Sequence, residues 1–203
     1  MNAHKAALRK ELRARRRGLS ATEHAQRSNR AAQMIARLPQ FSAGSRIALY
    51  LPFDAEVDTA GLIAVACRRG IRSYVPVVSD ARHGRIGFYP LAGPTRRGRY
   101  GILVPHRNVG PVDPRWLDLV VVPLVGVDAA GKRLGMGAGY YDRVMAFRRG
   151  RVDWRGPRLI GLAFDCQRVE SISAEPWDLG LDYLATETGL LQYHGGGSCV
   201  IGC

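Results

Sequence analysis

This sequence of 203 residues has few of the features that mark membrane-spanning, secreted or zinc-binding proteins. It contains no run of 18 apolar residues and no recognisable signal peptide, as a membrane-spanning helix or an exported protein would require. Only four cysteines occur. Cys67 and Cys166 follow apolar patterns that predict buried thiols, whereas Cys199 and Cys203 lie in a glycine-rich tail without a histidine at zinc spacing. We therefore expect a protein of the reducing cytoplasm.

Two common nucleotide-binding motifs are also missing. No Gly-Lys-Ser or Gly-Lys-Thr occurs, which excludes the Walker loop. The closely spaced glycines alternate as GxGxG and so differ from the dinucleotide-binding fingerprint GxGxxG. These absences exclude the two motifs without excluding phosphate binding itself.

Lysine is scarce although the chain is basic. Thirty Lys and Arg residues face 17 Asp and Glu residues, a net charge of +13, yet lysine occurs only at positions 5, 10 and 132. The charge suits an anionic partner such as a nucleic acid, a membrane surface or a polyphosphate. The excess of arginine over lysine is more typical of codon bias than of RNA recognition. Lys5 and Lys132 lie in the segments that we predict to bind phosphate.

The composition is that of one globular domain. Apolar residues make up 46% and charged residues 23% of the chain, enough for a substantial core. We predict helices at 3–17, from 20 to about 38 and from 58 or 59 to 70, and strands at 46–52, 72–78, 85–91 and 158–165, the last continuing through 167–172. This alternation predicts a three-layer αβα fold of the α/β class with a mixed or mostly parallel central sheet, Rossmann-like, as in sugar-phosphate isomerases and CoA transferases. We expect a single domain over residues 1–192 and a disordered tail over 193–203.

The stretch from Leu119 to Arg149 organises the rest of the chain. It opens with a β-branched run that predicts a strand buried on both faces. The glycines Gly135, Gly137 and Gly139 follow, and a short helix is predicted after them. Without Cβ atoms, such a turn lets backbone N–H groups approach an anion, and a helix N-terminus adds about half a positive charge.

Charged residues beside these glycines support a phosphate site. Lys132 and Arg133 place two cations next to the loop, and Asp142 could hold a divalent metal that bridges to phosphate oxygens. The alternative is a flexible loop whose glycines serve only tight turns.

Two further groups of residues have both a functional and a structural interpretation. Glu56 follows the strand at 46–52, where open α/β sheets place their ligands, but it could equally compensate a helix dipole.

In the first helix Lys5, Arg9, Arg13 and Arg17 recur at every fourth position, where like charges cost a few tenths of a kcal/mol each. A nearby anion would relieve this repulsion; a solvated basic face is the alternative.

Several motifs together resemble a known family. Residues Asp128, Gly131, Arg133-Leu134-Gly135, Gly137 and Gly139-Tyr140-Tyr141-Asp142-Arg143 resemble the signature of the 5-formyltetrahydrofolate cyclo-ligases, also called 5,10-methenyltetrahydrofolate synthetases. The segment with Lys5, Leu8 and Arg9 and the closing segment from Pro176 to Glu187 are similar to that family's first and last motifs. The resemblance extends to about Leu191.

The resemblance implies an ATP- and Mg²⁺-dependent ligase. It would convert 5-formyltetrahydrofolate to 5,10-methenyltetrahydrofolate by phosphorylating the formyl oxygen, after which N10 attacks and ADP and phosphate are released, without a covalent nucleophile on the protein. The implied ATP-binding residues are Lys5, Arg9, Arg133, Leu134, Gly135, Met136, Gly137, Ala138, Gly139, Tyr140 and Tyr141. The implied folate-binding residues are Leu51, Glu56, Tyr100 and Tyr140. The implied metal ligands are Asp142 and Asp178.

Some expectations stay open at the level of sequence. Val104 replaces a glutamate often found in the family, and Asp178 could simply begin a turn. A basic RNA-binding module remains an alternative, although the arginine-rich first helix lacks the aromatic residues that RNA readers expose. A sugar-phosphate isomerase or a CoA transferase is a second alternative. We expect a monomer without membrane contact, and the positive charge would suit a polyglutamylated folate, whose tail is anionic.

Overall fold

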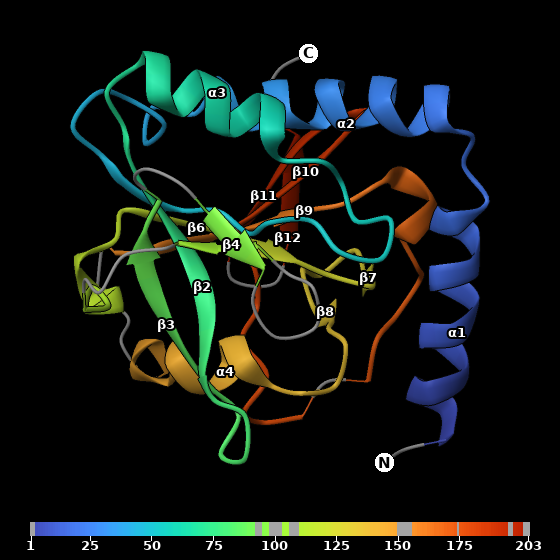
Figure 1. Cartoon of the computed structure of the whole chain (residues 1–203). Helices are drawn as coiled ribbons and strands as arrows, with labels where there is room; N and C mark the ends of the chain where they lie inside the picture. Colours follow the sequence, from blue (N-terminus) through green and yellow to red (C-terminus); the bar gives the residue numbers. More distant parts are fainter. Residues whose placement is uncertain are drawn as a thin grey trace.

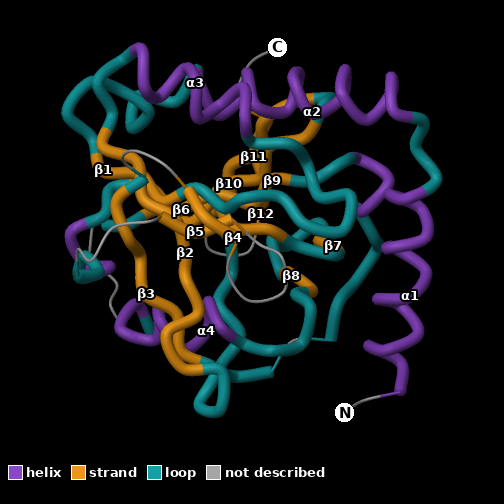
Figure 2. Tube along the Cα trace, viewed as in Figure 1, coloured by secondary structure: helices purple, strands orange, loops and turns teal. Residues whose placement is uncertain are grey.

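The computed structural model describes residues 3–91, 95–97, 103–105, 110–149, 156–173, 175–194 and 197–200. Figures 1 and 2 show helices packed around a central sheet. The helices are α1 (Ala3–Arg17), α2 (Ala21–Ala36), α3 (Ala60–Arg68) and α4 (Tyr140–Val144), with 3-10 turns η2 (Pro114–Trp116), η3 (Ala146–Arg148) and η4 (Asp165–Gln167). The strands are β1 (Arg46–Ala48), β2 (Arg72–Asp80), β3 (Arg85–Pro90), β4 (Thr95–Arg97), β5 (Leu103–Pro105), β6 (Leu119–Pro123), β7 (Gly126–Val127), β8 (Arg133–Leu134), β9 (Arg158–Leu162), β10 (Tyr183–Thr186), β11 (Gly189–His194) and β12 (Gly197–Val200).

The central sheet is mixed, as predicted. Its eight strands follow the order β12-β11-β10-β9-β6-β1-β2-β3. The inner strands from β10 to β2 pair in parallel, with Val120 opposite Leu159 and Ile47 opposite Leu119, while β3, β11 and β12 pair antiparallel at the edges. The short pairs β4–β5 and β7–β8 lie outside this sheet.

Helices cover both faces of the sheet. In Figure 1, α2 and α3 lie above the sheet, α4 lies below it, and α1 runs along one side. Strand β6 is buried on both faces, as its β-branched sequence predicts: Leu119 and Val121 pack with the α2–α3 layer, and Val120 and Val122 pack on the opposite side. The predicted α/β architecture is therefore confirmed.

Local capping explains where two helices begin. The Ser20 hydroxyl accepts the Glu23 N–H, and the Glu23 carboxylate accepts the Ser20 N–H, so the predicted capping box is present at the start of α2. At α3 the Asp58 carboxylate accepts the Ala60 N–H at 2.8 Å. Thr59, which could equally have capped α3, instead donates its hydroxyl to the Tyr50 carbonyl at 2.7 Å.

Three local predictions were wrong. The segment 167–172 does not continue β9, because the Gln167 side chain turns back to donate to the Leu124 and Val125 carbonyls at 2.8 and 3.0 Å. The tail from 193 onward is not disordered throughout, since Gly197–Val200 pairs with β11 as the edge strand β12. Cys67 is exposed, because Leu62 and Ala66 occupy the inward positions of α3.

Cys166 is half-buried, and this burial raises the pKa of its thiol. Within the described residues, no helix combines the length and apolarity needed to cross a membrane.

The topology brings two strand ends together. Strands β1 and β6 are parallel neighbours, so the connection after Ala48 and the glycine-containing segment after Pro123 leave the sheet at the same edge. Open α/β sheets bind their ligands at such an edge.

Candidate active site

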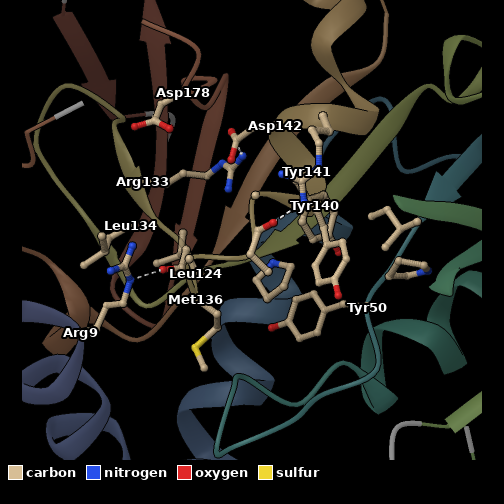
Figure 3. Close-up of a pocket in the computed structure, with 18 of the residues that line it drawn as sticks. Arg9, Tyr50, Leu124, Arg133, Leu134, Met136, Tyr140, Tyr141, Asp142 and Asp178 are labelled. Carbon is tan, nitrogen blue, oxygen red and sulfur yellow. Dashed lines mark hydrogen bonds and ion pairs between the residues drawn. The ribbon is translucent and has the colours of Figure 1, made fainter. Parts of the chain in front are cut away.

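A cavity of about 930 Å³ lies beside these strand ends. Residues of α1, of the β1–α3 connection, of the segment from Pro123 to Arg149 and of the segment from Ile172 to Asp178 line it. Figure 3 shows Asp142, Asp178 and Arg133 grouped in one part of the cavity and Tyr50 in another. The cavity thus has a charged region and an aromatic region.

The predicted phosphate loop forms one wall of the charged region. Gly137 and Gly139 have φ values of +96° and +64°, which side chains with a Cβ atom rarely adopt. Arg9 donates from Nε to the Gly135 carbonyl at 2.9 Å, so α1 holds the loop directly (Figure 3). Tyr140, the residue after Gly139, begins the short helix α4.

Cations and carboxylates alternate around this loop. Arg133 Nη2 lies 2.6 Å from Asp142 Oδ1, and Lys5 Nζ lies 3.2 Å from Glu175 Oε1 and 3.8 Å from Asp178 Oδ2. Arg133 is nearly buried, and its Nε has no hydrogen-bond partner within the described residues. A buried guanidinium with an unused donor is suited to bind an anion, because leaving such a donor unpaired is costly.

The carboxylates fit a magnesium ion that is bound together with phosphate. Asp142 and Asp178 line the same cavity, while the described part of the chain holds no cluster of three His, Cys, Asp or Glu residues that could form a complete protein cage. Mg²⁺ usually takes one or two carboxylates and completes its shell with water and substrate phosphates. Two carboxylates beside a phosphate loop meet this requirement.

Glu56 lies in the aromatic region. Its Oε2 accepts the Phe53 N–H at 3.1 Å, and the side chains of Tyr50, Leu51 and Tyr141 line the same cavity. Burial raises the pKa of Glu56 from 4.5 to about 7, against the opposing effects of the Phe53 hydrogen bond and of Arg16. A carboxyl group with this pKa can be either a donor or an acceptor near neutral pH.

Tyr141 stands between the two regions. Burial, together with the nearby Glu56 carboxylate, raises the pKa of its hydroxyl well above the ordinary value, so the phenol stays protonated. The Arg133 guanidinium lies 6.0 Å from the centre of the Tyr141 ring.

Within the described part of the chain, the structure brings together the site residues that the family resemblance implies. Every described residue that the family resemblance implies lines the cavity: Lys5, Arg9, Leu51, Glu56, Arg133, Leu134, Gly135, Met136, Gly137, Ala138, Gly139, Tyr140, Tyr141, Asp142 and Asp178. Tyr100 lies outside the described residues, and the side chain of Val104 is likewise not described. Lys132, considered as a second cation beside the loop, is exposed and is not among the residues that line the cavity.

Sequence reasoning missed several residues that line the cavity. Arg149 donates from Nη2 to the Asp142 carbonyl at 2.9 Å and to the Trp177 carbonyl at 2.8 Å, joining the two segments that carry the predicted metal ligands. Phe53, Trp177 and Glu175 also line the cavity. The proximity of Glu175 and Trp177 to Asp178 was a usable signal, whereas Arg149 had none beyond its place at the end of the central stretch.

Comparisons with known proteins point to one family. A sequence model described as the 5-formyltetrahydrofolate cyclo-ligase family matches residues 1–187. The chain is 33% identical over 187 residues to the 5-formyltetrahydrofolate cyclo-ligase of Escherichia coli strain K12, covering 90% of this chain and 100% of that protein. It is 34% identical over 179 residues to the Haemophilus influenzae protein of the same name, covering 86% and 92%. Its fold is similar to the NMR structure of Aquifex aeolicus 5,10-methenyltetrahydrofolate synthetase, with a TM-score of 0.80, 29% identity and coverage of 96% and 95%.

Proposed function

Because this chain belongs to the 5-formyltetrahydrofolate cyclo-ligase family, we propose that it uses ATP and Mg²⁺ to convert 5-formyltetrahydrofolate to 5,10-methenyltetrahydrofolate. The observation that carries the proposal is the cavity itself. It joins a glycine loop with cations and two carboxylates to an aromatic region that contains Glu56. A reaction between a nucleotide and a pterin needs both kinds of surface side by side.

The charged region would bind ATP. Lys5, Arg9 and Arg133 would neutralise the phosphates, and the unused Nε donor of Arg133 would gain a phosphate oxygen as acceptor. The loop from Leu134 to Gly139 would place backbone N–H groups against the phosphates, which its positive-φ glycines permit.

Asp142 and Asp178 would hold the magnesium ion that accompanies ATP. The ion would supply neutralisation of charge on the phosphate groups being transferred. Since Arg133 now pairs with Asp142 and Lys5 approaches Asp178, each cation would turn from its carboxylate toward a phosphate when the nucleotide binds.

The aromatic region would bind the folate. Leu51 and Tyr140 would pack against the pterin, and Glu56 would hydrogen-bond to the pterin or to the nitrogen that carries the formyl group. With a pKa of about 7, Glu56 could donate or accept this hydrogen bond at physiological pH. Tyr141, between the two regions, would contact both ligands.

The chemistry would depend on position and charge. The formyl oxygen attacks the γ-phosphorus of ATP, and ADP leaves. N10 of the folate then attacks the activated formyl carbon, the C–O bond to phosphate breaks, and loss of the N10 proton gives the methenyl bridge and inorganic phosphate. Holding the formyl oxygen in line with the phosphoryl group accounts for most of what such a site must do. The side chains in the cavity therefore need no covalent nucleophile.

We further place the reaction in the cytoplasm, with a monomer acting on 5-formyltetrahydrofolate. The net charge of +13 would favour a polyglutamylated substrate over the monoglutamate through long-range attraction.

The test follows the absorbance of the methenyl product. Purified protein is mixed with 5-formyltetrahydrofolate, with and without ATP and with and without Mg²⁺, and the band should rise only when both are present. No rise from folded protein would refute the proposal and turn attention to RNA binding by the basic surface.

Replacing Asp142 by Asn should abolish this turnover while the circular dichroism spectrum stays unchanged. The variant keeps an oxygen acceptor but loses the charge that Mg²⁺ requires, and we expect at least about a hundredfold loss of kcat. Asp113→Asn is the matched control, because Asp113 pairs with Arg115 on the surface and does not line the cavity. Normal magnesium-dependent turnover in Asp142→Asn would remove Asp142 from the metal site.

A further inference from the structure

The turn at residues 53–56 has an unfavourable backbone conformation. Asp54 and Ala55 have φ values of 55° and 57°, and the Glu56 N–H donates to the Phe53 carbonyl at 3.1 Å. Tight turns with positive φ at both central residues strongly favour Asn, Asp and Gly, so Asp54 suits its position but Ala55 does not. An alanine at such a position pays a steric cost without a side-chain hydrogen bond in return. The turn therefore needs support from elsewhere in the molecule.

That support comes from helix α1. Arg13 Nε lies 2.7 Å from Asp54 Oδ2, Arg16 Nη2 lies 3.0 Å from the same oxygen, and Arg17 Nε lies 2.6 Å from Oδ1. The Asp54 side chain is only 6% exposed. Burial alone would raise the pKa of Asp54, but the hydrogen bonds from Arg13 and Arg17 lower it below the ordinary value, so the group is a charged carboxylate. We refer to Asp54 with these three arginines as the arginine brace.

Arg16 connects the turn to the centre of the fold. Its side chain is fully buried, and Nη1 donates to the Leu124 carbonyl at 3.3 Å, directly after strand β6. An arginine is rarely buried to this extent unless its charge is paired. Arg16 therefore ties Asp54 to the end of strand β6, which precedes the segment that carries the phosphate loop.

Glu56 is the last residue of the braced turn. Its carboxylate accepts the Phe53 N–H, and its backbone carbonyl lies 3.0 Å from His24 Nε2. If the turn opened, the hydrogen bond from Phe53 would be lost and the Glu56 side chain would be free to leave the cavity.

We propose that Asp54 and Arg16 are positioning residues, which hold the turn at 53–56 so that Glu56 faces the folate region of the cavity. The proposal rests on the proposed function in one respect, the contact between Glu56 and folate. Helix α1 also carries Lys5 and Arg9 at the nucleotide region, so the same helix aligns both halves of the site. The repeated basic residues of α1 thus have different partners along its length.

The test begins with Asp54→Asn. Asparagine keeps the size of the side chain and tolerates positive φ, but it loses the charge that holds three arginines. We expect the Glu56 amide, which is bonded to Phe53, to exchange with solvent about tenfold faster by native-state NMR, as a local opening becomes easier. We expect the Kd for 5-formyltetrahydrofolate to rise about tenfold by calorimetry, while the Kd for ATP changes less than about threefold.

A second substitution distinguishes positioning from general loss of stability. Ala55→Gly, added to Asp54→Asn, should restore slow exchange of the Glu56 amide and most of the folate affinity, because glycine takes positive φ without strain. Arg15→Ala is the matched control: Arg15 lies on the same helix but pairs with Glu11, and it should change neither measurement.

Each outcome is decisive. Unchanged exchange of the Glu56 amide in Asp54→Asn would overturn the brace, and faster exchange with unchanged folate affinity would overturn the positioning of Glu56. If wild-type protein failed to bind 5-formyltetrahydrofolate, the proposed function would be refuted. Exchange of the Glu56 amide would still test whether the arginine brace holds the turn at 53–56. If Asp54→Asn did not fold, Arg17→Ala, which removes a half-exposed arginine, should shift both measurements in the same direction by a smaller factor.

Discussion

At the scale of single residues, the cavity places charges of opposite sign in contact. Arg133 pairs with Asp142 and Lys5 with Glu175, so the nucleotide region is close to neutral in itself. Among the described residues Glu56 has no such partner, because Arg16, the cation that lowers its pKa, forms its ion pair with Asp54. Burial therefore dominates its ionisation, and Glu56 is the carboxyl group whose protonation can be measured most directly.

Glu56 should make the stability of the fold depend on pH. Its pKa is about 7 in the folded protein and 4.5 in the unfolded chain, so the folded protein binds this proton more tightly. The stability that protonated Glu56 contributes is therefore complete below pH 4.5 and is lost as the pH rises through 7. Compared with Glu56→Gln, the wild type should lose about 1 to 2 kcal/mol of unfolding free energy between pH 4.5 and 8, a figure reduced for partial exposure to solvent. Urea denaturation at several pH values measures this difference.

The matched control for this prediction is Glu11→Gln. Glu11 is exposed on α1 and pairs with Arg15, so its replacement should leave the pH dependence of the wild type in place. Parallel pH profiles for the wild type and Glu56→Gln would show that Glu56 titrates normally.

At the scale of elements, the loop between β8 and α4 depends on its backbone conformation more than on its side chains. Gly137 has a φ of +96°, and a Cβ atom placed there would lie 3.5 Å from the Arg9 guanidinium. That distance is an ordinary van der Waals contact, so the positive φ, rather than a lack of space, favours glycine at this position. The loop and α1 therefore form one unit at the nucleotide region.

Gly137→Ala should weaken ATP binding. Alanine at this φ would shift the loop and its contact with Arg9, and we expect the KM for ATP to rise about tenfold while the KM for folate changes little. Steady-state kinetics with each substrate varied in turn measure the two constants.

Gly44→Ala is the control for Gly137→Ala, because it introduces similar backbone strain away from the cavity. Gly44 also has positive φ, +80°, but no atom lies within 4 Å of its Cβ position and it does not line the cavity. Gly44→Ala should therefore lower the stability of the fold and leave the KM values for ATP and folate unchanged. An equal effect of the two substitutions on ATP would argue against a role for the loop in nucleotide binding.

At the scale of the whole molecule, the site and the C-terminal edge of the sheet are separate. Among the described residues, Asp178 is the last that lines the cavity, and β12 pairs with β11 at the edge of the sheet. Strand β11 contributes more, because Leu190 is buried in the core and Tyr193 packs on Gly131.

Deleting residues 195–203 should therefore leave kcat/KM within about twofold of the full chain, since β12 is a terminal edge strand that pairs with β11. Deleting residues 189–203 should instead prevent stable folding, because it removes Leu190 and leaves β10 without its antiparallel partner. Turnover and thermal denaturation of the two truncated chains test this contrast. A tenfold loss of activity in the shorter deletion would show that β12 supports the site.

Much of the candidate site could be predicted because its motifs are local. The glycine loop, Arg133 and Asp142 lie within one short stretch, and Glu56 directly follows a predicted strand. Arg149, Glu175 and Trp177 were missed, because their roles depend on contacts with segments distant in the chain, such as that between Arg149 and the Trp177 carbonyl.

The sequence by itself determined the local features of this protein. The capping box at Ser20 and Glu23 and the β-branched run of β6 depend on hydrogen bonds and burial patterns within a few residues, and the family motifs are equally local. Tertiary structure alone decided which distant groups meet. Lys5 and Glu175 are 170 residues apart and Arg16 and Asp54 are 38 apart. Their pairing follows from how α1 packs on η4 and, through Leu12, against Val125 in the segment after β6. The packing of α3 likewise turned Cys67 outward, because this helix presents only the face with Leu62 and Ala66 to the core.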